Sequence, residues 1–296
     1  MLIWRLILGP LIILAALGIF TLDYQIGESA PLFLVVCLAL CLRSVWELHQ
    51  LFKTRAFETV FWLPALCTGL IIAANWIPHW STTVAQKLDP LGNLGPAFLA
   101  LAISVTLLFL HATSKYRAPG HTIETLGAEI LMICYVGVLA SLTLQLRWVQ
   151  GPDRGYIPFA SLIVVTKAGD ISAFFIGRMF GRSKLIPLVS PGKTWAGFRG
   201  AVVGSVLASV LFFHAIVPLF VHDAYVPRLW VSMLYGLLVG LAGMMGDLCE
   251  SLIKRDVGQK DSSHLLPGFG GLLDLMDSIF FPGPLAYLLW LWLPMH

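Results

Sequence analysis

The segment LWVSMLYGLLVGLAGMMGDLCESLI, residues 229–253, is an apolar run of membrane-spanning length that ends in charged side chains. A helix needs about 18 to 25 apolar residues to cross a hydrocarbon core roughly 30 Å thick. Further runs of this kind occur near residues 2–22, 30–48, 59–78, 95–111, 124–147, 156–179, 200–221 and 277–294. The sequence therefore predicts an all-α, polytopic integral membrane protein with about nine transmembrane helices.

The composition agrees with a membrane protein. Apolar residues make up 58% of the 296 positions and charged residues 12%, with a mean hydropathy of +0.84, whereas about 25% of residues are charged in an ordinary soluble domain. The net charge of +3 is too small to predict a nucleic-acid partner. The five cysteines form no CxxC pair, so we expect neither disulfides nor a zinc site.

The positions of lysine and arginine predict the orientation of the chain. With the N-terminus inside, 14 of the 19 basic residues fall in inner segments, 4 fall in outer loops, and Lys167 lies within a span. This bias follows the positive-inside rule and predicts a cytoplasmic N-terminus, with the first run kept as a span rather than removed as a signal peptide. Residues 246–278 would then face the cytoplasm.

Polar side chains gather in the segment GDLCESLIKRDVGQKDSSHLLPGFGGLLDLMDS, residues 246–278. On a helix, the spacing of its first polar residues places them on one face; they are Asp247, Glu250, Ser251 and Lys254. A loop at residues 255–271 follows, and then Asp274 and Asp277 begin the final apolar run. Those two carboxylates are either site residues or simple caps of the last helix. Glu250 is either a ligand or the i+4 partner of Lys254.

Two further polar features precede this segment. Lys167 and Asp170 lie three residues apart inside the sixth span, where they either line a polar site or form a structural ion pair. Residues 177–200, GRMFGRSKLIPLVSPGKTWAGFRG, form a basic inner loop rich in glycine, in which Arg178, Ser190, Lys193 and Thr194 are suited to bind phosphate. The loop is not a Walker A motif, because the residue five before Gly192 is Pro187.

These features together indicate phosphoryl or nucleotidyl transfer to or from a lipid. The carboxylate oxygens of Asp247, Asp274 and Asp277 are hard ligands of the kind that Mg²⁺ prefers. An ion-coupled transporter is the alternative class, since it also places charged side chains within spans. The first half of the chain shows no repeat of the polar cluster, and this counts against the transporter. We expect residues 1–155 to hold about five spans and residues 156–296 to hold about four spans with the catalytic loops.

The run SLIKRDVGQKDSSHLLPGFGGLLDLMDS, residues 251–278, resembles the signature of the phosphatidate cytidylyltransferases, or CDP-diacylglycerol synthases. The matching residues are Ser251, Lys254, Arg255, Lys260, Asp261, Pro267, Gly270, Gly271, Asp274 and Asp277. An upstream stretch is also similar to the family, at Asp170, Gly177, Arg178, Gly181, Lys184, Pro187, Ser190, Pro191, Lys193, Thr194 and Gly197. The resemblance is close from residue 167 onward, and the first half matches only as a set of spans.

This resemblance implies a reaction between CTP and phosphatidate of the inner leaflet that gives CDP-diacylglycerol and pyrophosphate. It implies Mg²⁺ with a monovalent cation such as K⁺ and a homodimer. With the charge bias, we expect an active site facing the cytoplasm in a bacterial inner membrane, and an organelle membrane is the alternative. The implied catalytic residues are Asp247, Ser251, Lys254 and Asp274, and the implied metal ligands are Asp247, Asp274 and Asp277. Substrate or phosphate binding is expected at Lys167, Asp170, Arg178, Ser190, Lys193, Thr194, Arg255 and Lys260. A CTP-dependent transferase or kinase acting on another lipid, such as an archaeal ether lipid, is the nearest alternative.

Three positions depart from the family pattern. Ala196, Phe269 and Leu275 stand where the family usually has glutamate, histidine and arginine. We interpret Phe269 and Leu275 as a variant in which the loop packs through apolar contacts. Solvated loop residues are the alternative for Lys260, Asp261 and His264.

Overall fold

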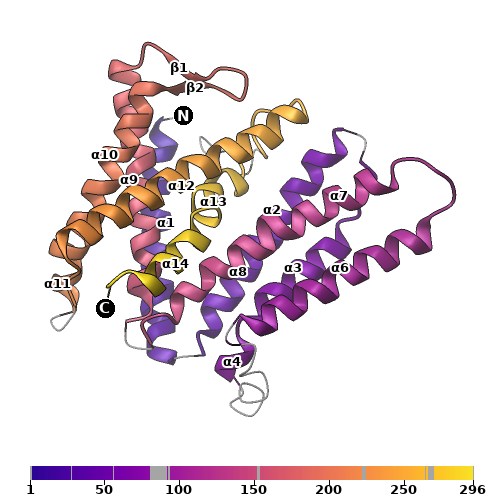
Figure 1. Cartoon of the computed structure of the whole chain (residues 1–296), viewed down its shortest axis with the longest axis horizontal. Helices are drawn as coiled ribbons and strands as arrows, with labels where there is room; N and C mark the ends of the chain where they lie inside the picture. Colours follow the sequence, from indigo (N-terminus) through magenta and orange to yellow (C-terminus); the bar gives the residue numbers. More distant parts are fainter. Residues whose placement is uncertain are drawn as a thin grey trace. The chain divides into compact units, whose positions relative to one another are not determined.

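The computed structural model describes residues 2–27, 29–55, 57–80, 92, 94–151, 154–221, 225–263, 265 and 270–295. Of residues 2–10, 12 and 13 it describes the backbone. The chain divides into two compact units: Met1–Ser141 with Val257–Leu275, and Leu142–Asp256 with Met276–His296. Figure 1 labels helices and strands of both units. Within the polar segment 246–278 the chain passes from one unit to the other twice, after Asp256 and after Leu275. The predicted division at residue 155, which rests on composition, stays a prediction.

The first unit is helical. Its helices are α1 (Leu2–Ile26), α2 (Pro31–Lys53), α3 (Trp62–Ala74), α4 (Ile77–Trp80), α6 (Gly95–Lys115) and α7 (Thr122–Met132), followed by a π-helical segment, Ile133–Val138, and the start of α8 (Leu139–Leu144). Its core includes Leu63, Cys67 and Ile71 of α3, packed with Leu108 of α6. The start of α2 is stabilised from α1, because Asp23 Oδ1 accepts hydrogen bonds from the backbone N–H groups of residues 32 and 33.

The second unit is built around three long helices. Its elements are a 3₁₀ turn (Gln145–Arg147), α9 (Tyr156–Phe180), β1 (Lys184–Ile186), β2 (Ser190–Thr194), α10 (Trp195–Leu211), a π-helical segment (Phe212–Ile216), α11 (Val217–Phe220), α12 (Leu229–Asp256), most of α13 (Leu273–Phe280) and α14 (Gly283–Trp292). Helix α10 packs along both α9 and α12. Small residues permit this, since a Cβ at Gly204 would lie 2.1 Å from Ser172 Oγ and one at Gly240 would lie 2.4 Å from Ser205 Oγ.

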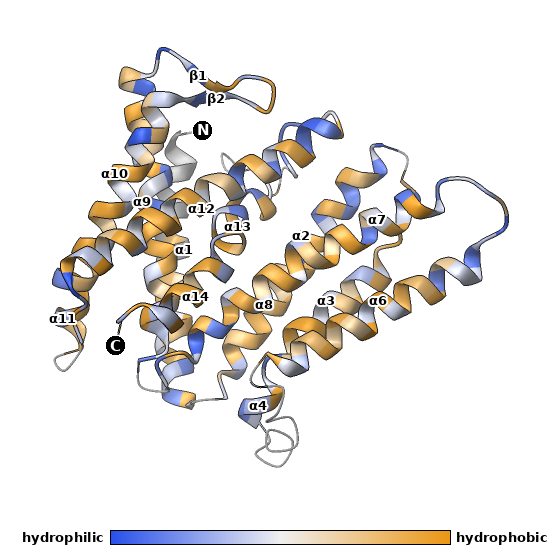
Figure 2. Cartoon of the chain, in the orientation of Figure 1, coloured by the Kyte–Doolittle hydropathy of each residue, from blue (hydrophilic) through white to orange (hydrophobic). Residues whose placement is uncertain are grey.

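Seven helical segments within the described ranges are long and apolar enough to cross a membrane: Pro31–Lys53, Gly95–Lys115, Thr122–Arg147, Tyr156–Phe180, Trp195–Phe220, Leu229–Asp256 and Leu273–Trp292. Two shorter apolar helices, Leu14–Ile26 and Trp62–Ala74, overlap the two remaining predicted runs, residues 2–22 and 59–78. Figure 2 shows apolar residues along most of the helical length and hydrophilic residues mainly at helix ends and connections. The predicted all-α membrane fold is confirmed, while nine crossings and an inside N-terminus stay predictions.

The basic segment 177–200 differs from the predicted loop. It continues α9 to Phe180, forms an antiparallel hairpin of β1 and β2 in which Lys184 pairs with Thr194, and then enters α10. Thr194 ends the strand and caps the helix, because its Oγ1 accepts a hydrogen bond from Gly197 N at 3.1 Å. The SPGKT residues are therefore held in an extended strand rather than in an open loop.

Candidate functional site

Helix α12 carries the first half of the polar cluster on one face, as its spacing predicts. Glu250, Ser251 and Lys254 are buried, while the side chain of Asp247 is 39% exposed. Lys254 Nζ lies 2.8 Å from Glu250 Oε2, and Ser251 Oγ lies 3.4 Å from Asp247 Oδ1. Glu250 is thus the ion-pair partner of Lys254, and each buried charge of this pair is offset by the other.

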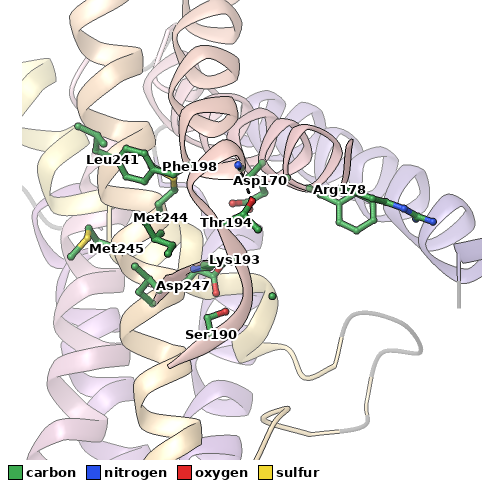
Figure 3. Close-up of a pocket in the computed structure, with 17 residues that line it drawn as sticks. Asp170, Arg178, Ser190, Lys193, Thr194, Phe198, Leu241, Met244, Met245 and Asp247 are labelled. Carbon is green, nitrogen blue, oxygen red and sulfur yellow. Dashed lines mark hydrogen bonds and ion pairs between the residues drawn. The ribbon is translucent and has the colours of Figure 1, made fainter. Parts of the chain in front are cut away.

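The hairpin contacts α12 at two points. Lys193 Nζ, from β2, lies 2.8 Å from Asp247 Oδ2, and Figure 3 shows the two side chains directed toward one another. Closer to the C-terminal end of α12, Arg255 Nε donates a hydrogen bond to the carbonyl oxygen of Val189 at 3.2 Å. These contacts bring the SPGKT strand to the carboxylate of the GDLCES segment.

A second group of charges connects α9 with the end of α13. Lys167 Nζ lies 3.6 Å from Asp170 Oδ2 and donates a hydrogen bond to Ser278 Oγ at 2.7 Å. Asp277 is buried, and its carboxylate interacts electrostatically with those of Asp247 and Asp170. Lys167 and Asp170 do form an ion pair, and Asp170 also lines the pocket described below.

Gly246 explains how Asp277 can lie close to α12. A Cβ at this position would be 2.6 Å from the carbonyl oxygen of Asp277 and 2.6 Å from the Cβ of Phe281. Without a side chain at Gly246, the backbone of α13 can approach α12 directly beside Asp247. The glycine of the GD pair is therefore a packing requirement of the site.

A pocket of about 830 Å³ opens among α9, the hairpin, α10 and α12. Its polar lining includes Asp170, Ser190, Lys193, Thr194 and Asp247, and its apolar lining includes Phe174, Phe198, Leu241, Met244 and Met245 (Figure 3). One cavity thus offers a charged region next to an apolar wall. Such a lining suits an amphipathic ligand with a phosphate group.

The remaining predicted phosphate-binding residues are placed less centrally. Arg178 contributes to the lining, but its side chain is exposed and points away from Lys193 and Asp247 in Figure 3. Arg255 and Lys260 are exposed.

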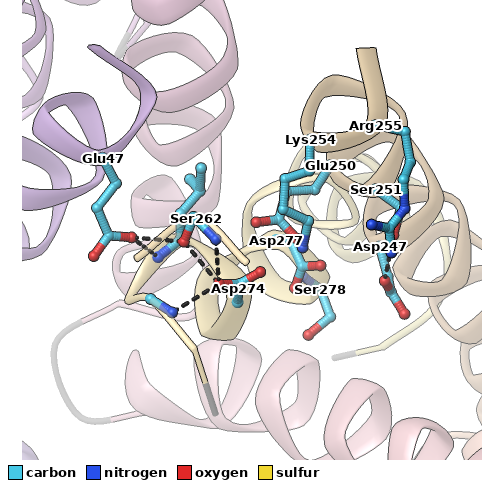
Figure 4. Close-up of polar contacts among 12 residues, drawn as sticks. Glu47, Asp247, Glu250, Ser251, Lys254, Arg255, Ser262, Asp274, Asp277 and Ser278 are labelled. Atoms are coloured by element: carbon cyan, nitrogen blue, oxygen red, sulfur yellow. Dashed lines mark hydrogen bonds and ion pairs between the residues drawn. The ribbon is translucent and has the colours of Figure 1, made fainter. Parts of the chain in front are cut away.

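Asp274 lies in the first turn of α13, within the segment assigned to the first unit. Its Oδ2 accepts hydrogen bonds from Ser262 N at 3.0 Å, Ser262 Oγ at 2.7 Å and Gly271 N at 2.7 Å. Ser262 Oγ also lies 2.9 Å from Glu47 Oε2 of α2 (Figure 4). The structure therefore shows Asp274 organising its own loop, and the predicted role of Asp274 as a metal ligand stays a prediction.

Glu47 was not predicted as a functional residue, although a signal for it exists in the sequence. It is an acid inside an apolar run of membrane-spanning length, four residues after Arg43, and such residues are functional candidates by default.

Of the three departures from the family pattern, Ala196 and Leu275 are half-buried. Phe269, the third, lies outside the described residues, as does the loop residue His264.

The carboxylates of the second unit form only a partial donor set for a metal ion. In the described part of the chain, no group of three or more His, Cys, Asp and Glu side chains is placed to hold a metal ion. Mg²⁺ commonly binds through only one or two carboxylates together with substrate phosphates. Asp247 and Asp277, which interact electrostatically and supply only oxygen atoms, fit such a partial donor set.

Comparisons with known proteins agree with the motifs. A phosphatidate cytidylyltransferase of Chlamydia trachomatis is 33% identical over 199 residues, which cover 66% of this chain and 63% of that protein. One of Haemophilus influenzae is 28% identical over 273 residues and 90% of each chain. An uncharacterized Escherichia coli protein is 42% identical over 126 residues, or 43% of this chain and 40% of that one. The chain thus spans less than two thirds of the Chlamydia and Escherichia coli relatives.

The family comparison covers nearly the whole chain. The model of the cytidylyltransferase family matches residues 4–293, which include both the apolar first half and the polar segments of the second half. This chain is therefore a membrane protein that belongs to the cytidylyltransferase family.

Proposed function

We propose that the protein transfers a cytidylyl group from CTP to phosphatidate, giving CDP-diacylglycerol and pyrophosphate for phospholipid synthesis. The observation that supports this proposal most is the pocket of the second unit, where the Lys193 and Asp247 pair lies next to an apolar wall that includes Phe174 and Met245. Phosphatidate has an anionic head and acyl chains, so it matches both parts of the lining. The names of the Chlamydia and Haemophilus relatives agree with this substrate.

The reaction requires no protein nucleophile. A phosphate oxygen of phosphatidate attacks the α-phosphorus of CTP in line and forms the new P–O bond. The bond between that phosphorus and the oxygen bridging to the β-phosphate breaks, and pyrophosphate leaves with the electron pair. The protein contributes positioning and charge neutralisation, as in other phosphoryl transfers.

We assign the residues roles that follow from their places. Lys193, on the hairpin, would turn from Asp247 to a substrate phosphate. Asp247 and Asp277 would hold Mg²⁺, which when bound supplies positive charge against the triphosphate and the leaving pyrophosphate. Ser251 and Lys254 lie on α12 together with Asp247, and Lys167 of α9 contacts Ser278, the residue after Asp277. These three residues would orient the carboxylates or contact phosphate.

The setting of the site is part of the proposal. The excess of basic residues in the predicted inner segments supports an active site on the cytoplasmic face of a bacterial inner membrane, with phosphatidate entering from the inner leaflet. A homodimer and an accompanying K⁺ follow from the family resemblance and stay predictions.

The test supplies the detergent-purified protein with labelled CTP, phosphatidate, diacylglycerol and Mg²⁺. Formation of CDP-lipid and pyrophosphate supports the proposal. CDP together with newly phosphorylated diacylglycerol would instead identify a lipid kinase, and ion flux in liposomes without either product would identify a transporter. Asp247→Asn should lower CDP-lipid formation by a factor on the order of a hundred or more. Asp256→Asn, at an exposed position on the same helix, is the matched control.

A further inference from the structure

Glu47 of α2 is a buried carboxylate that the proposed chemistry does not use. Its side chain is 0% exposed, and Arg43 Nη2 lies 3.2 Å from its Oε1. Four more groups reach it from the segment Val257–Leu275 of the same unit. Ser263 Oγ at 2.7 Å and Leu272 N at 3.0 Å donate to Oε1, and Leu273 N at 2.8 Å donates to Oε2. Ser262 Oγ lies 2.9 Å from Oε2 and shares its single proton between Glu47 and Asp274. Burying a charge is costly without such compensation, so the contacts fix the side chain and the segment together.

Two of these donors are the backbone amides at the beginning of α13. The first amides of a helix have no acceptor within the helix, and a Ser, Thr, Asp or Asn just before the helix usually supplies one. Here Leu272 stands just before Leu273, the first residue of α13, and has no side-chain acceptor. Glu47, which lies on α2, supplies the acceptor for these amides instead. Its negative charge is favourable at a helix N-terminus.

The two glycines before α13 serve the turn that leads to Glu47. A Cβ at Gly271 would lie 2.0 Å from Ser262 Oγ and 2.4 Å from Glu47 Oε2. Gly270 has a φ of +95°, a region that residues with a side chain rarely adopt. Gly271 therefore leaves room for the Glu47 carboxylate, and Gly270 permits the turn that precedes it.

We infer that Glu47 is a positioning residue that holds the signature segment and the start of α13 in place for the reaction. Asp274 lies within the turn whose backbone amides donate to Glu47. Setting where α13 begins therefore sets where the Asp274 carboxylate is presented. The effect of Glu47 on catalysis rests on the proposed function. The docking of residues 257–275 against Glu47 rests on the contacts alone.

The experiment compares wild-type protein, Glu47→Gln and Glu58→Gln in detergent by hydrogen exchange and by CDP-lipid formation. The Glu47→Gln substitution keeps the shape of the side chain but removes the charge and one acceptor oxygen. We expect faster amide exchange at residues 271–273, by about tenfold or more, with exchange in α3 and α6 unchanged. We expect kcat per folded protein to fall on the order of tenfold. Glu58 is exposed beyond the end of α2, so Glu58→Gln should change neither quantity.

Ser263→Ala provides a milder second variant. It removes one donor and leaves the Glu47 carboxylate intact, so exchange and kcat should change in the same direction but less. In the Glu47→Gln background, the same substitution should add little, because the acceptor is already impaired. A role limited to general stability would give additive effects instead.

Each result decides the inference. Unchanged exchange at residues 271–273 in Glu47→Gln would overturn the docking, and faster exchange with full kcat would overturn the positioning role. Exchange that rises equally in α3 and α6 would show general destabilisation and would also count against it. A wild-type protein that makes no CDP-lipid would refute the proposed function, while the exchange data would still decide whether Glu47 holds the segment.

Discussion

Lys193 Nζ of β2 lies 2.8 Å from Asp247 Oδ2 of α12, and both residues line the pocket. The two side chains are 24% and 39% exposed, so solvent screens their attraction. Partly exposed ion pairs of this kind contribute about 0 to 1 kcal/mol to folding. The pair is therefore better placed to serve the chemistry of the pocket than the stability of the fold.

Replacing Lys193 separates these two roles. In Lys193→Met we expect CDP-lipid formation to fall on the order of a hundredfold, because a phosphate partner is lost. The free energy of unfolding should change by less than about 1 kcal/mol. Lys184→Met, at an exposed lysine of the paired strand, is the control. Activity of Lys193→Met equal to that of the control would remove Lys193 from the proposed site.

The dependence on Mg²⁺ tests Asp277. EDTA should stop the reaction, and Mg²⁺ should restore it. In Asp277→Asn the Mg²⁺ concentration for half-maximal activity should rise at least about tenfold, since a ligand is weakened. Titrations of wild type, Asp277→Asn and the control Asp256→Asn measure this. An unchanged Mg²⁺ requirement in Asp277→Asn would show that Asp277 does not hold the ion.

Asp274→Asn distinguishes a metal ligand from a residue that organises the loop. We expect it to abolish turnover while the protein stays folded in the membrane. Ser262→Ala removes a hydroxyl that contacts Asp274 Oδ2 at 2.7 Å, but it leaves the carboxylate in place. It should therefore lower kcat without changing the Mg²⁺ requirement. Equal loss of kcat in both variants, with the same Mg²⁺ requirement, would mean that Asp274 acts only through the loop.

Gly246→Ala tests the close approach of α13 to α12. The new Cβ would lie 2.6 Å from the carbonyl oxygen of Asp277, and overpacking of this kind typically costs about 1 to 3 kcal/mol. We expect a lower unfolding temperature in detergent and a loss of activity larger than the loss of folded protein. Gly127→Ala in α7, where a Cβ meets no atom within 4 Å, is the control. If both variants behave like wild type, the contact is not tight.

The apolar wall of the pocket predicts an effect confined to the lipid substrate. Met245 lines the pocket and is 51% exposed, and Met245→Gln makes this wall more polar. The KM for long-chain phosphatidate should rise about threefold to tenfold, in line with partial loss of a buried apolar side chain, while the KM for CTP stays the same. Met179→Gln, at an exposed methionine of α9 outside the lining, serves as the control. Equal changes in both KM values would argue against acyl chains at this wall.

Much of the fold follows from local patterns in the chain. Apolar runs such as residues 229–253 predict helices, because a backbone in lipid must satisfy its own hydrogen bonds. The face of α12 that bears Asp247, Glu250 and Lys254 follows from helical periodicity alone. The hairpin was not predicted, because the strand Ser190–Thr194 depends on pairing with Lys184–Ile186 rather than on its own residue types.

The sequence predicted the polar residues of the candidate site but not the contacts that hold them in place. Glu47 contacts residues that follow it by 215 to 226 positions, so no spacing within the chain links them. The role of Gly246 is likewise invisible in sequence, because it depends on the backbone of α13 coming within reach. Chemistry could be inferred from residue types, whereas the contacts that hold those residues depend on tertiary packing.

The segment Val257–Leu275 belongs to the same compact unit as α2, although it is flanked in the chain by residues of the other unit. A gene fragment encoding only residues 156–296 would contain every residue proposed for cytidylyl transfer, yet its product would lack the carboxylate that accepts the first amides of α13. A chimera that joins residues 156–296 to another first half would keep these contacts only if that half also carried an acid at the position of Glu47.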